Sequence, residues 1–485
     1  MKRGFVLASI MLAMFLAAIE ATIVSTAMPG IVADLGGFSL YSWVFSAYLL
    51  TNASTVLLFG KLSDTYGRKP IFMTGISLFL IGSVIAAMAE FMIILIAARF
   101  VQGLGAGALM PIATTIVGDM YTKEERAKIQ GYLSSVWGIS AVTGPLLGGF
   151  FVDVLSWPFV FWMNIPLGLL ALAGVMLFFK EKVDRRAASK VELKSSLYIM
   201  VVICLAVLIL VEGGFGIKWI SLEMLVLFIA AAASFLLFLR SEHTSMNPML
   251  PLHLWQNPVI RYANLTSFTT GMILIGVSSY LPAFVQGVME QSATIAGFTL
   301  TTMSIGWPVA STVAGRLLLI IGFRLTSILG AGALIVGTGL FSLLTPEKGP
   351  IFAAAGSLFI GIGMGLSTTS FIVSIQNSVA WQTRGIATAS NMFMRTLGSA
   401  VGAAVLGGLL NNRIHESLQQ AGIEEEYTVD STNLLLNKEA RADLSGQALQ
   451  VFKEGLTDGL HLVYLCLLIL AFISFMFILR LPKKG

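Results

Sequence analysis

Long apolar stretches recur along the whole chain, and they constrain its fold more than any other feature. Fourteen stretches have the length and composition of membrane-spanning helices, at roughly 5–28, 41–60, 71–89, 92–118, 130–152, 159–179, 196–212, 219–239, 262–283, 294–314, 325–344, 350–371, 387–410 and 459–480. A helix crosses the bilayer with about 20 apolar residues, because it satisfies its own backbone hydrogen bonds in lipid. Barrel strands would alternate apolar and polar residues, and these stretches do not. The sequence therefore predicts an all-α membrane protein with fourteen transmembrane helices.

The composition excludes other classes of protein. Hydrophobic residues make up 56% of the 485 residues and charged residues 11%, whereas a soluble domain carries about 25% charged residues. An ordinary water-soluble enzyme and a disordered chain are both excluded on this ground. Cys204 and Cys466 each lie in an apolar run, so they predict neither a disulfide framework nor a metal site.

Basic residues indicate how the helices are oriented. With fourteen crossings both termini lie on one side, and most of the 30 Lys and Arg residues fall in the loops of that side. Because cytoplasmic loops are enriched in Lys and Arg, we expect both termini to be cytoplasmic, in a bacterial cytoplasmic membrane. The net charge of +5 is thus explained by membrane orientation, and no nucleic-acid partner is expected.

A weak internal repeat divides the chain. Segments separated by about 255–259 residues match in the same order: the glycines at 60, 67 and 75 with those at 315, 322 and 330; those at 103, 105 and 107 with those at 361, 363 and 365; and Ser140 with Ser399 in similar surroundings. The repeat predicts an N-terminal six-helix half at 1–182, a cytoplasmic linker and two extra helices at 183–258, and a C-terminal six-helix half at 259–485 with a polar external loop at 411–458. Parallel repeats of this kind place a substrate site between the halves, near mid-membrane.

Glu20 is the most informative single residue. Among the acidic residues it alone is predicted to lie deep within a span, about 22 Å along its helix at 1.5 Å per residue. An ionised carboxylate at that depth costs at least ~2.5 kcal/mol, so it should be protonated, paired or facing a wet cavity. A structural partner for a buried Glu is the alternative. We expect Glu20 to exchange a proton, or a proton for a cationic substrate.

Polar residues mark three further segments. Asp64, Arg68 and Lys69 lie in the short cytoplasmic connection between the second and third helices, where a carboxylate can face a helix N-terminus. Arg99 and Gln102 lie inside the fourth helix, and an intramembrane Arg needs a partner or water. In the fifth helix, the pair Gly144-Pro145 predicts a kink and a close contact with another helix.

These segments resemble the signature motifs of the major facilitator superfamily, and the fifth-helix segment is similar to the motif of its antiporters. The first-helix segment from Ile19 to Pro29 resembles that of the fourteen-span drug:proton antiporters, with Glu20 where an Asp is usual. Ser140 stands where the antiporter motif has a glycine. The resemblance extends over almost the whole chain and implies the major facilitator fold, with two six-helix halves and two additional helices.

The resemblance also implies roles for residues. Glu20 and Arg99 would serve proton coupling, while Asp64, Arg68, Lys69, Gly144 and Pro145 would control the change between inward and outward states. The candidate substrate-binding residues are Glu20, Tyr48, Gln102, Trp137, Gln286, Trp307 and Asn391. Together with Trp162, Gln376 and Arg395 they would line a mixed aromatic and polar cavity, and aromatic faces also bind cations.

The sequence thus predicts a secondary active transporter, not an enzyme: a proton-coupled antiporter that exports lipophilic, often cationic drugs. The proton gradient would drive it without a cofactor, and we expect a functional monomer in the lipid bilayer. A drug-specific exporter of the tetracycline type and an exporter of a single metabolite are the alternatives within this fold. A membrane enzyme would need clustered nucleophiles, acids or metal ligands in its loops, and a channel would need a charged ring or pore motif. Neither pattern is found, and a P-loop is absent too.

Overall fold

The structure is a computed structural model, and it describes residues 3–121, 123–181, 193–212, 221–244, 252–379, 383–423, 426–436, 441, 444 and 446–482. Within these ranges every regular element is a helix. Thirteen of the described helices have the length and apolar composition needed to cross a membrane. The all-α membrane fold is therefore confirmed, although the count of fourteen spans is not.

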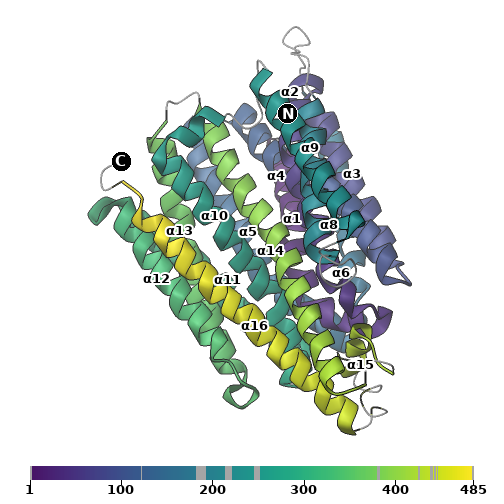
Figure 1. The fold of residues 1–485 in the computed structure, drawn as a ribbon. Helices are drawn as coiled ribbons and strands as arrows, with labels where there is room; N and C mark the ends of the chain where they lie inside the picture. The colour runs from purple at the N-terminus through teal and green to yellow at the C-terminus, as the bar shows by residue number, and fades with distance from the viewer. Residues whose placement is uncertain are drawn as a thin grey trace.

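The helices form two groups that pack side by side (Figure 1). The first comprises α1 (Arg3–Leu35), α2 (Tyr41–Tyr66), α3 (Arg68–Ala87), α4 (Met92–Met120), α5 (Lys123–Val154), the short α6 (Phe159–Trp162) and α7 (Asn164–Phe178). The second comprises α10 (Pro258–Ala283), α11 (Ala293–Ile320), α12 (Gly322–Ser342), α13 (Gly349–Asn377), α14 (Arg384–Gln420) and α16 (Gly446–Leu479). The start of α1 and the end of α16 lie at the same end of the bundle. We call this the terminal end, and the other the distal end.

Two helices lie between the groups in sequence and outside them in space. Helix α8 (Leu193–Glu212) packs against α2 of the first half and α14 of the second, and α9 (Leu222–Thr244) packs on α8. Only 11% of the apolar window of α9 is buried, so most of this helix faces the surroundings. The described apolar stretch of α8, Leu197–Ala206, is too short to count as a span.

The internal repeat is visible in the helix contacts. A side chain on Gly105 of α4 would place its Cβ 2.5 Å from the carbonyl oxygen of Gly75 on α3. At the equivalent place in the second half, a Cβ on Gly363 of α13 would lie 2.8 Å from the carbonyl oxygen of Gly330 on α12. Both glycine pairs therefore allow two helix backbones to touch, as small residues do in membrane helices. The sequence matches thus correspond to matching contacts.

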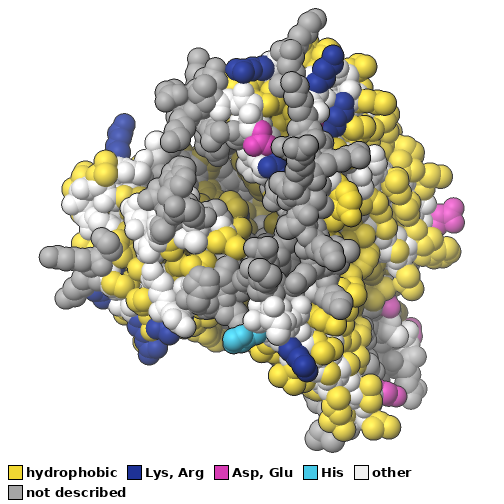
Figure 2. All heavy atoms as spheres, turned by 90° about the horizontal axis from the view of Figure 1, so that it is seen from above, with side chains coloured by type: hydrophobic (Ala, Val, Ile, Leu, Met, Phe, Trp, Pro, Cys, Tyr) yellow, Lys and Arg dark blue, Asp and Glu magenta, His cyan; other side chains and the backbone are white. Residues whose placement is uncertain are grey.

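The two halves meet at the distal end. There α5 packs against α11 and α2 against α14. The hydroxyl of Tyr41 donates a hydrogen bond of 2.6 Å to the carbonyl oxygen of Ser279, and the side chain of Asn411 donates one of 2.7 Å to that of Ser39. Figure 2 shows the terminal end, where Lys and Arg side chains lie around the periphery.

The predicted span 159–179 is confirmed as the candidate span Phe159–Phe178, in which the single turn residue Met163 separates α6 from α7. The predicted external loop 411–458 is shorter, since α14 continues to Gln420 and α16 begins at Gly446. Both extensions are amphipathic, and buried apolar residues such as Leu418 of α14 and Phe452 of α16 pack them against the bundle. The domain boundaries at 182 and 258 stay predictions.

Candidate functional site

Glu20 is buried at the centre of a polar cluster. Its side chain is fully inaccessible, and its carboxylate forms an ion pair with Arg99, whose side chain is 2% exposed. The side-chain amide of Asn164 donates a second hydrogen bond, of 2.8 Å, to the other carboxylate oxygen. Burying two charges is costly unless they pair and their remaining atoms are hydrogen-bonded, and this arrangement meets both conditions.

Four helices supply this cluster. Glu20 comes from α1, Arg99 and Gln102 from α4, and Asn164 from the first turn of α7. The hydroxyl of Ser83 on α3 accepts hydrogen bonds from Gln102 (2.9 Å) and Asn164 (3.2 Å). Asn164 is buried, and its side-chain amide reaches Glu20 on α1 and Ser83 on α3.

The guanidinium of Arg99 is held on several sides. It donates a hydrogen bond of 2.6 Å to the side-chain oxygen of Gln102 and one of 3.4 Å to the backbone oxygen of Val44. Its central carbon lies 4.1 Å from the centre of the Tyr48 ring, a cation–π distance. Arg99 therefore keeps partners even when its contact with Glu20 is weakened.

A small cavity of about 20 Å³ adjoins the ion pair. Its lining residues are Glu20, Val24, Phe45, Tyr48, Leu49, Arg99 and Ile275. About 10–15 Å³ of space open to the centre of a water molecule is enough to hold one water, so this cavity can hold one. Because Ile275 belongs to α10, the cavity lies where the first half meets the second. Across the described residues, no three His, Cys, Asp or Glu side chains gather as metal ligands.

The charged motif at the terminal end has partners that the sequence did not predict. The Arg68 side chain donates a hydrogen bond of 2.6 Å to Asp119. The carboxylate of Glu181 accepts hydrogen bonds from the backbone amides of Arg68 (2.7 Å) and Lys69 (2.8 Å), which begin α3. Lys69 donates to the carbonyl oxygens at the end of α7. The side chain of Asp64 lies outside the described residues.

Gly144 and Pro145 lie where α5 contacts α1 of its own half and α11 of the other half. Gly144 lies against Thr22 of α1, and a Cβ there would overlap the Thr22 hydroxyl. The backbone oxygen of Pro145 faces Gly297 of α11, where a Cβ would likewise overlap it. The predicted close contact is therefore present, while the predicted role in conformational change stays a prediction.

The other candidate substrate residues lie apart from the Glu20 cluster. Trp137 is 45% exposed, and Gln286 donates a hydrogen bond of 3.2 Å to the backbone oxygen of Thr26. Asn391 is buried and donates to Asn264 (3.1 Å) and Ser267 (2.8 Å). Trp307 lies under the guanidinium of Arg395, whose central carbon is 5.8 Å from the centre of one indole ring. None of these contacts tests a role in substrate binding.

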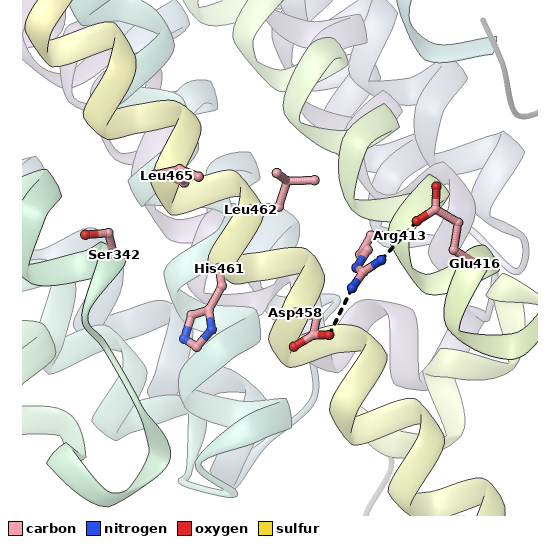
Figure 3. Close-up of a pocket in the computed structure, with 7 residues that line it drawn as sticks. All are labelled: Ser342, Arg413, Glu416, Asp458, His461, Leu462 and Leu465. Atoms are coloured by element: carbon pink, nitrogen blue, oxygen red, sulfur yellow. Dashed lines mark hydrogen bonds and ion pairs between the residues drawn. The ribbon is translucent and has the colours of Figure 1, made fainter. Parts of the chain in front are cut away.

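A larger hollow of about 530 Å³ lies at the distal end of the second half. Its lining residues are Ser342, Arg413, Glu416, Asp458, His461, Leu462 and Leu465. Figure 3 shows Arg413 between Glu416 on its own helix (3.1 Å) and Asp458 on α16 (3.3 Å). These charged groups satisfy one another, and the hollow is separate from the Glu20 cavity.

Sequence reasoning missed Asn164, Ser83, Asp119 and Glu181. Asn164 had a detectable signal, because an Asn in an apolar run needs a hydrogen-bonding partner. Ser83 had none, because a Ser in a membrane helix can satisfy its hydroxyl on its own helix backbone. Asp119 and Glu181 lie near helix ends, where acidic residues are common and a partner depends on the fold.

Comparison with known proteins agrees with this architecture. The sequence profile described as "Major Facilitator Superfamily" matches residues 10–403. The chain belongs to this superfamily. It is therefore a multi-pass membrane transporter rather than an enzyme.

Two bacterial proteins are similar to this chain over most of its length. "Multidrug resistance protein 3" of Bacillus subtilis is 34% identical over 417 residues, covering 86% of this chain and 81% of the relative. "Multidrug transporter protein MdtP" of the same species is 33% identical over 414 residues, covering 85% and 76%. Among solved structures, an inward-facing, unoccupied bacterial homologue of the human lysosomal transporter Spinster has a TM-score of 0.67 at 17% identity, covering 99% of this chain and 97% of its own. This likeness shows the shared fold.

Proposed function

We propose that this transporter exports lipophilic, often cationic, small molecules in exchange for protons. Two similar proteins of Bacillus subtilis bear names that describe multidrug resistance and multidrug transport, which supports this class of cargo. We further propose a bacterial cytoplasmic membrane as its location, with both termini in the cytoplasm, and a monomer as the functional unit. The two halves would alternate between openings to the two sides of the membrane.

The observation that carries the proposal is the buried pair of Glu20 and Arg99 at a cavity touched by both halves. Placing a carboxylate and a guanidinium inside the membrane costs free energy. If the pair served only to stabilise the fold, its contribution to helix packing would have to offset that cost. Protonation of Glu20 would remove its attraction to Arg99, which keeps Gln102 and Tyr48 as partners. A carboxylate released in this way can alternate between a proton and a cationic substrate.

The driving force is sufficient for export. One charge moving down a potential of 100 mV yields about 2.3 kcal/mol, which sustains roughly a fortyfold gradient of a neutral substrate. When a monovalent cation exchanges for one proton, no net charge moves, so the pH difference alone drives export. Neutral and cationic substrates should therefore respond differently to membrane potential.

The test replaces the carboxylate without changing its size. Glu20→Gln should abolish dye transport driven by a pH gradient in proteoliposomes, whereas Glu20→Asp should retain part of it because the acid is kept. Glu223→Gln, which neutralises an exposed acid at the start of α9, is the matched control and should transport normally. Undiminished gradient-driven transport by the Glu20→Gln protein would remove Glu20 from the mechanism.

A further inference from the structure

Arg395 is an intramembrane charge that the proposed proton coupling does not use. It lies eleven residues after Arg384, at the start of α14, and thus about 17 Å into this helix at 1.5 Å per residue. The residue is half-buried and falls within the candidate span Ile386–Gln420. A cation at such depth requires a counter-charge, a hydrogen-bond acceptor or water.

No such partner for Arg395 is found among the described residues. Within the described ranges, the one side-chain interaction of Arg395 is with the Trp307 ring, whose centre lies 5.8 Å from the guanidinium carbon. The sequence explains why: between Pro258 and Arg413 the only acidic residues are Glu290 and Glu347, and both lie in connections at the distal end. Arg99, by contrast, has a carboxylate, an amide oxygen and a backbone oxygen. Within the described part of the chain, Arg395 is therefore a positive charge without a counter-charge.

Arg395 also lies near the cavity that adjoins Glu20. The backbone of Arg395 touches α10 at Gly271, where a Cβ would overlap the Arg395 carbonyl oxygen. Ile275, four residues further along α10, lines the Glu20 cavity. Four residues of helix span about 6 Å, so the two positions are one turn apart along the same helix. Since α10 begins at the terminal end, Arg395 lies on the side of the cavity nearer that end.

From this arrangement we infer that Arg395 and Trp307 form a subsite for an acidic group on the substrate. A guanidinium binds a carboxylate through two parallel hydrogen bonds, and the neighbouring indole offers a flat apolar surface for an adjoining ring. The subsite extends the range of cargo to lipophilic acids and zwitterions whose carboxylate supplies the missing counter-charge. This inference rests on the proposed export of lipophilic molecules, and it specifies part of their chemistry.

The test compares two dyes that differ only at the acid. Rhodamine B carries a free carboxylate, whereas in its ethyl ester that group is uncharged. Binding of each dye is measured by fluorescence anisotropy with the full chain in nanodiscs of phosphatidylcholine. A hydrogen bond to a charged group contributes about 1.5–3 kcal/mol, so Arg395→Gln should weaken binding of rhodamine B about tenfold or more and change binding of the ester less than about twofold.

Two further variants separate loss of the subsite from loss of structure. Arg395→Lys keeps the charge and should retain most of the preference for the acid. Arg261→Gln removes another Arg that lies over an aromatic ring, 5.3 Å from the centre of Tyr262, but at the exposed start of α10. This matched control should bind both dyes like the wild type. Size-exclusion chromatography confirms that each variant remains folded and monodisperse.

The outcomes distinguish this inference from the proposed function. If Arg395→Gln leaves the acid-to-ester affinity ratio unchanged, or if the wild type binds the ester alone, the acidic subsite is refuted while drug binding stands. If the wild type binds neither dye, the acidic subsite and the proposed export of lipophilic molecules are both contradicted. A lipid phosphate is a second source of anionic oxygen, so the measurement is repeated with phosphatidylglycerol in the nanodiscs. Loss of rhodamine B binding there, in the wild type but not in Arg395→Gln, would assign the site to lipid instead.

Discussion

The carboxylate of Asp153 on α5 accepts hydrogen bonds from both the backbone amide (2.9 Å) and the hydroxyl (2.5 Å) of Thr294 on α11. It also accepts one of 3.2 Å from the amide of Ala293. Asp153 thus caps the first turn of a helix in the other half, so this contact helps to hold the two halves together at the distal end. A helix cap contributes about 1 kcal/mol.

Removing this cap should favour opening at the distal end. Asp153→Ala is expected to change the ratio of distal-open to distal-closed molecules by roughly fivefold, from a loss of about 1 kcal/mol. Spin labels at Leu155 and Phe298, which are 53% and 57% exposed, report the separation of the two helix ends. Thr294→Val removes only the hydroxyl and should have a smaller effect. Identical distance distributions for Asp153→Ala and the wild type would contradict the prediction.

The Glu20–Arg99 pair predicts an order of stabilities. Arg99→Met leaves a buried carboxylate without its cation, which typically costs about 3–5 kcal/mol. Glu20→Gln should cost less, because the new amide oxygen can still accept a hydrogen bond from Arg99. The double variant should lose less stability than the sum of the two single losses, because it retains neither of the two buried charges. Thermal unfolding of the purified proteins gives this order, and simple additivity would show that the two side chains are not coupled.

The glycine contact between α3 and α4 predicts a strong effect of one methyl group. Gly105→Ala should lower the unfolding temperature, because its Cβ would lie 2.5 Å from the carbonyl oxygen of Gly75, and overpacking costs about 1–3 kcal/mol. The matched control is Gly339→Ala in α12, where nothing lies within 4 Å of the added Cβ. The control should be as stable as the wild type. Equal unfolding temperatures for both variants would show that the helices separate easily.

Glu290 predicts a pH dependence at the distal end. Its hydrogen bond from Lys453 (2.8 Å), opposed by slight burial and assisted by the charges of Lys453 and Arg441, holds the pKa of this carboxyl below its usual 4.5. A lowered pKa means that the stabilisation is present above the unfolded-state value and is lost as the pH falls through the folded-state value. Because Glu290 is 49% exposed and Lys453 39%, the effect should be below about 1 kcal/mol.

The Glu290 effect is measured as a difference between two proteins. Unfolding temperatures of the wild type and Glu290→Gln are compared at pH 6 and at a pH near 3. The variant should be slightly less stable at pH 6, and the two should converge in acid. A constant difference at both pH values would indicate that the loss comes from packing instead.

Much of this fold could be predicted from the sequence, because the membrane restricts the choices. Apolar runs must be helices in lipid, and a polar residue within such a run is conspicuous. Glu20, Arg99, Gln102 and Tyr48 were singled out in this way, and the structure brings the four together. Their roles in coupling and binding stay predictions.

The remaining features depend on contacts that the sequence pattern does not encode. Nothing in the pattern around Glu181 indicates that it caps α3, more than 100 residues earlier in the chain. The helical extensions beyond Asn411 and before Asp458 mix polar residues with buried apolar ones such as Leu418 and Phe452, so hydropathy alone cannot distinguish them from a loop. Asp153 lies at the end of a span, where an acid needs no explanation, and only the packing of two distant helices identifies its partner.

The position of α8 makes the two seams between the halves unequal. Helices α8 and α9 cover the seam formed by α2 and α14, while at the other seam α5 and α11 meet directly. The backbones of α5 and α11 touch at Pro145 and Gly297, so any opening of this seam toward the bilayer would require these two helices to separate. The extra pair thus shields one of the two seams, and none of the other described helices gives the second seam a comparable cover.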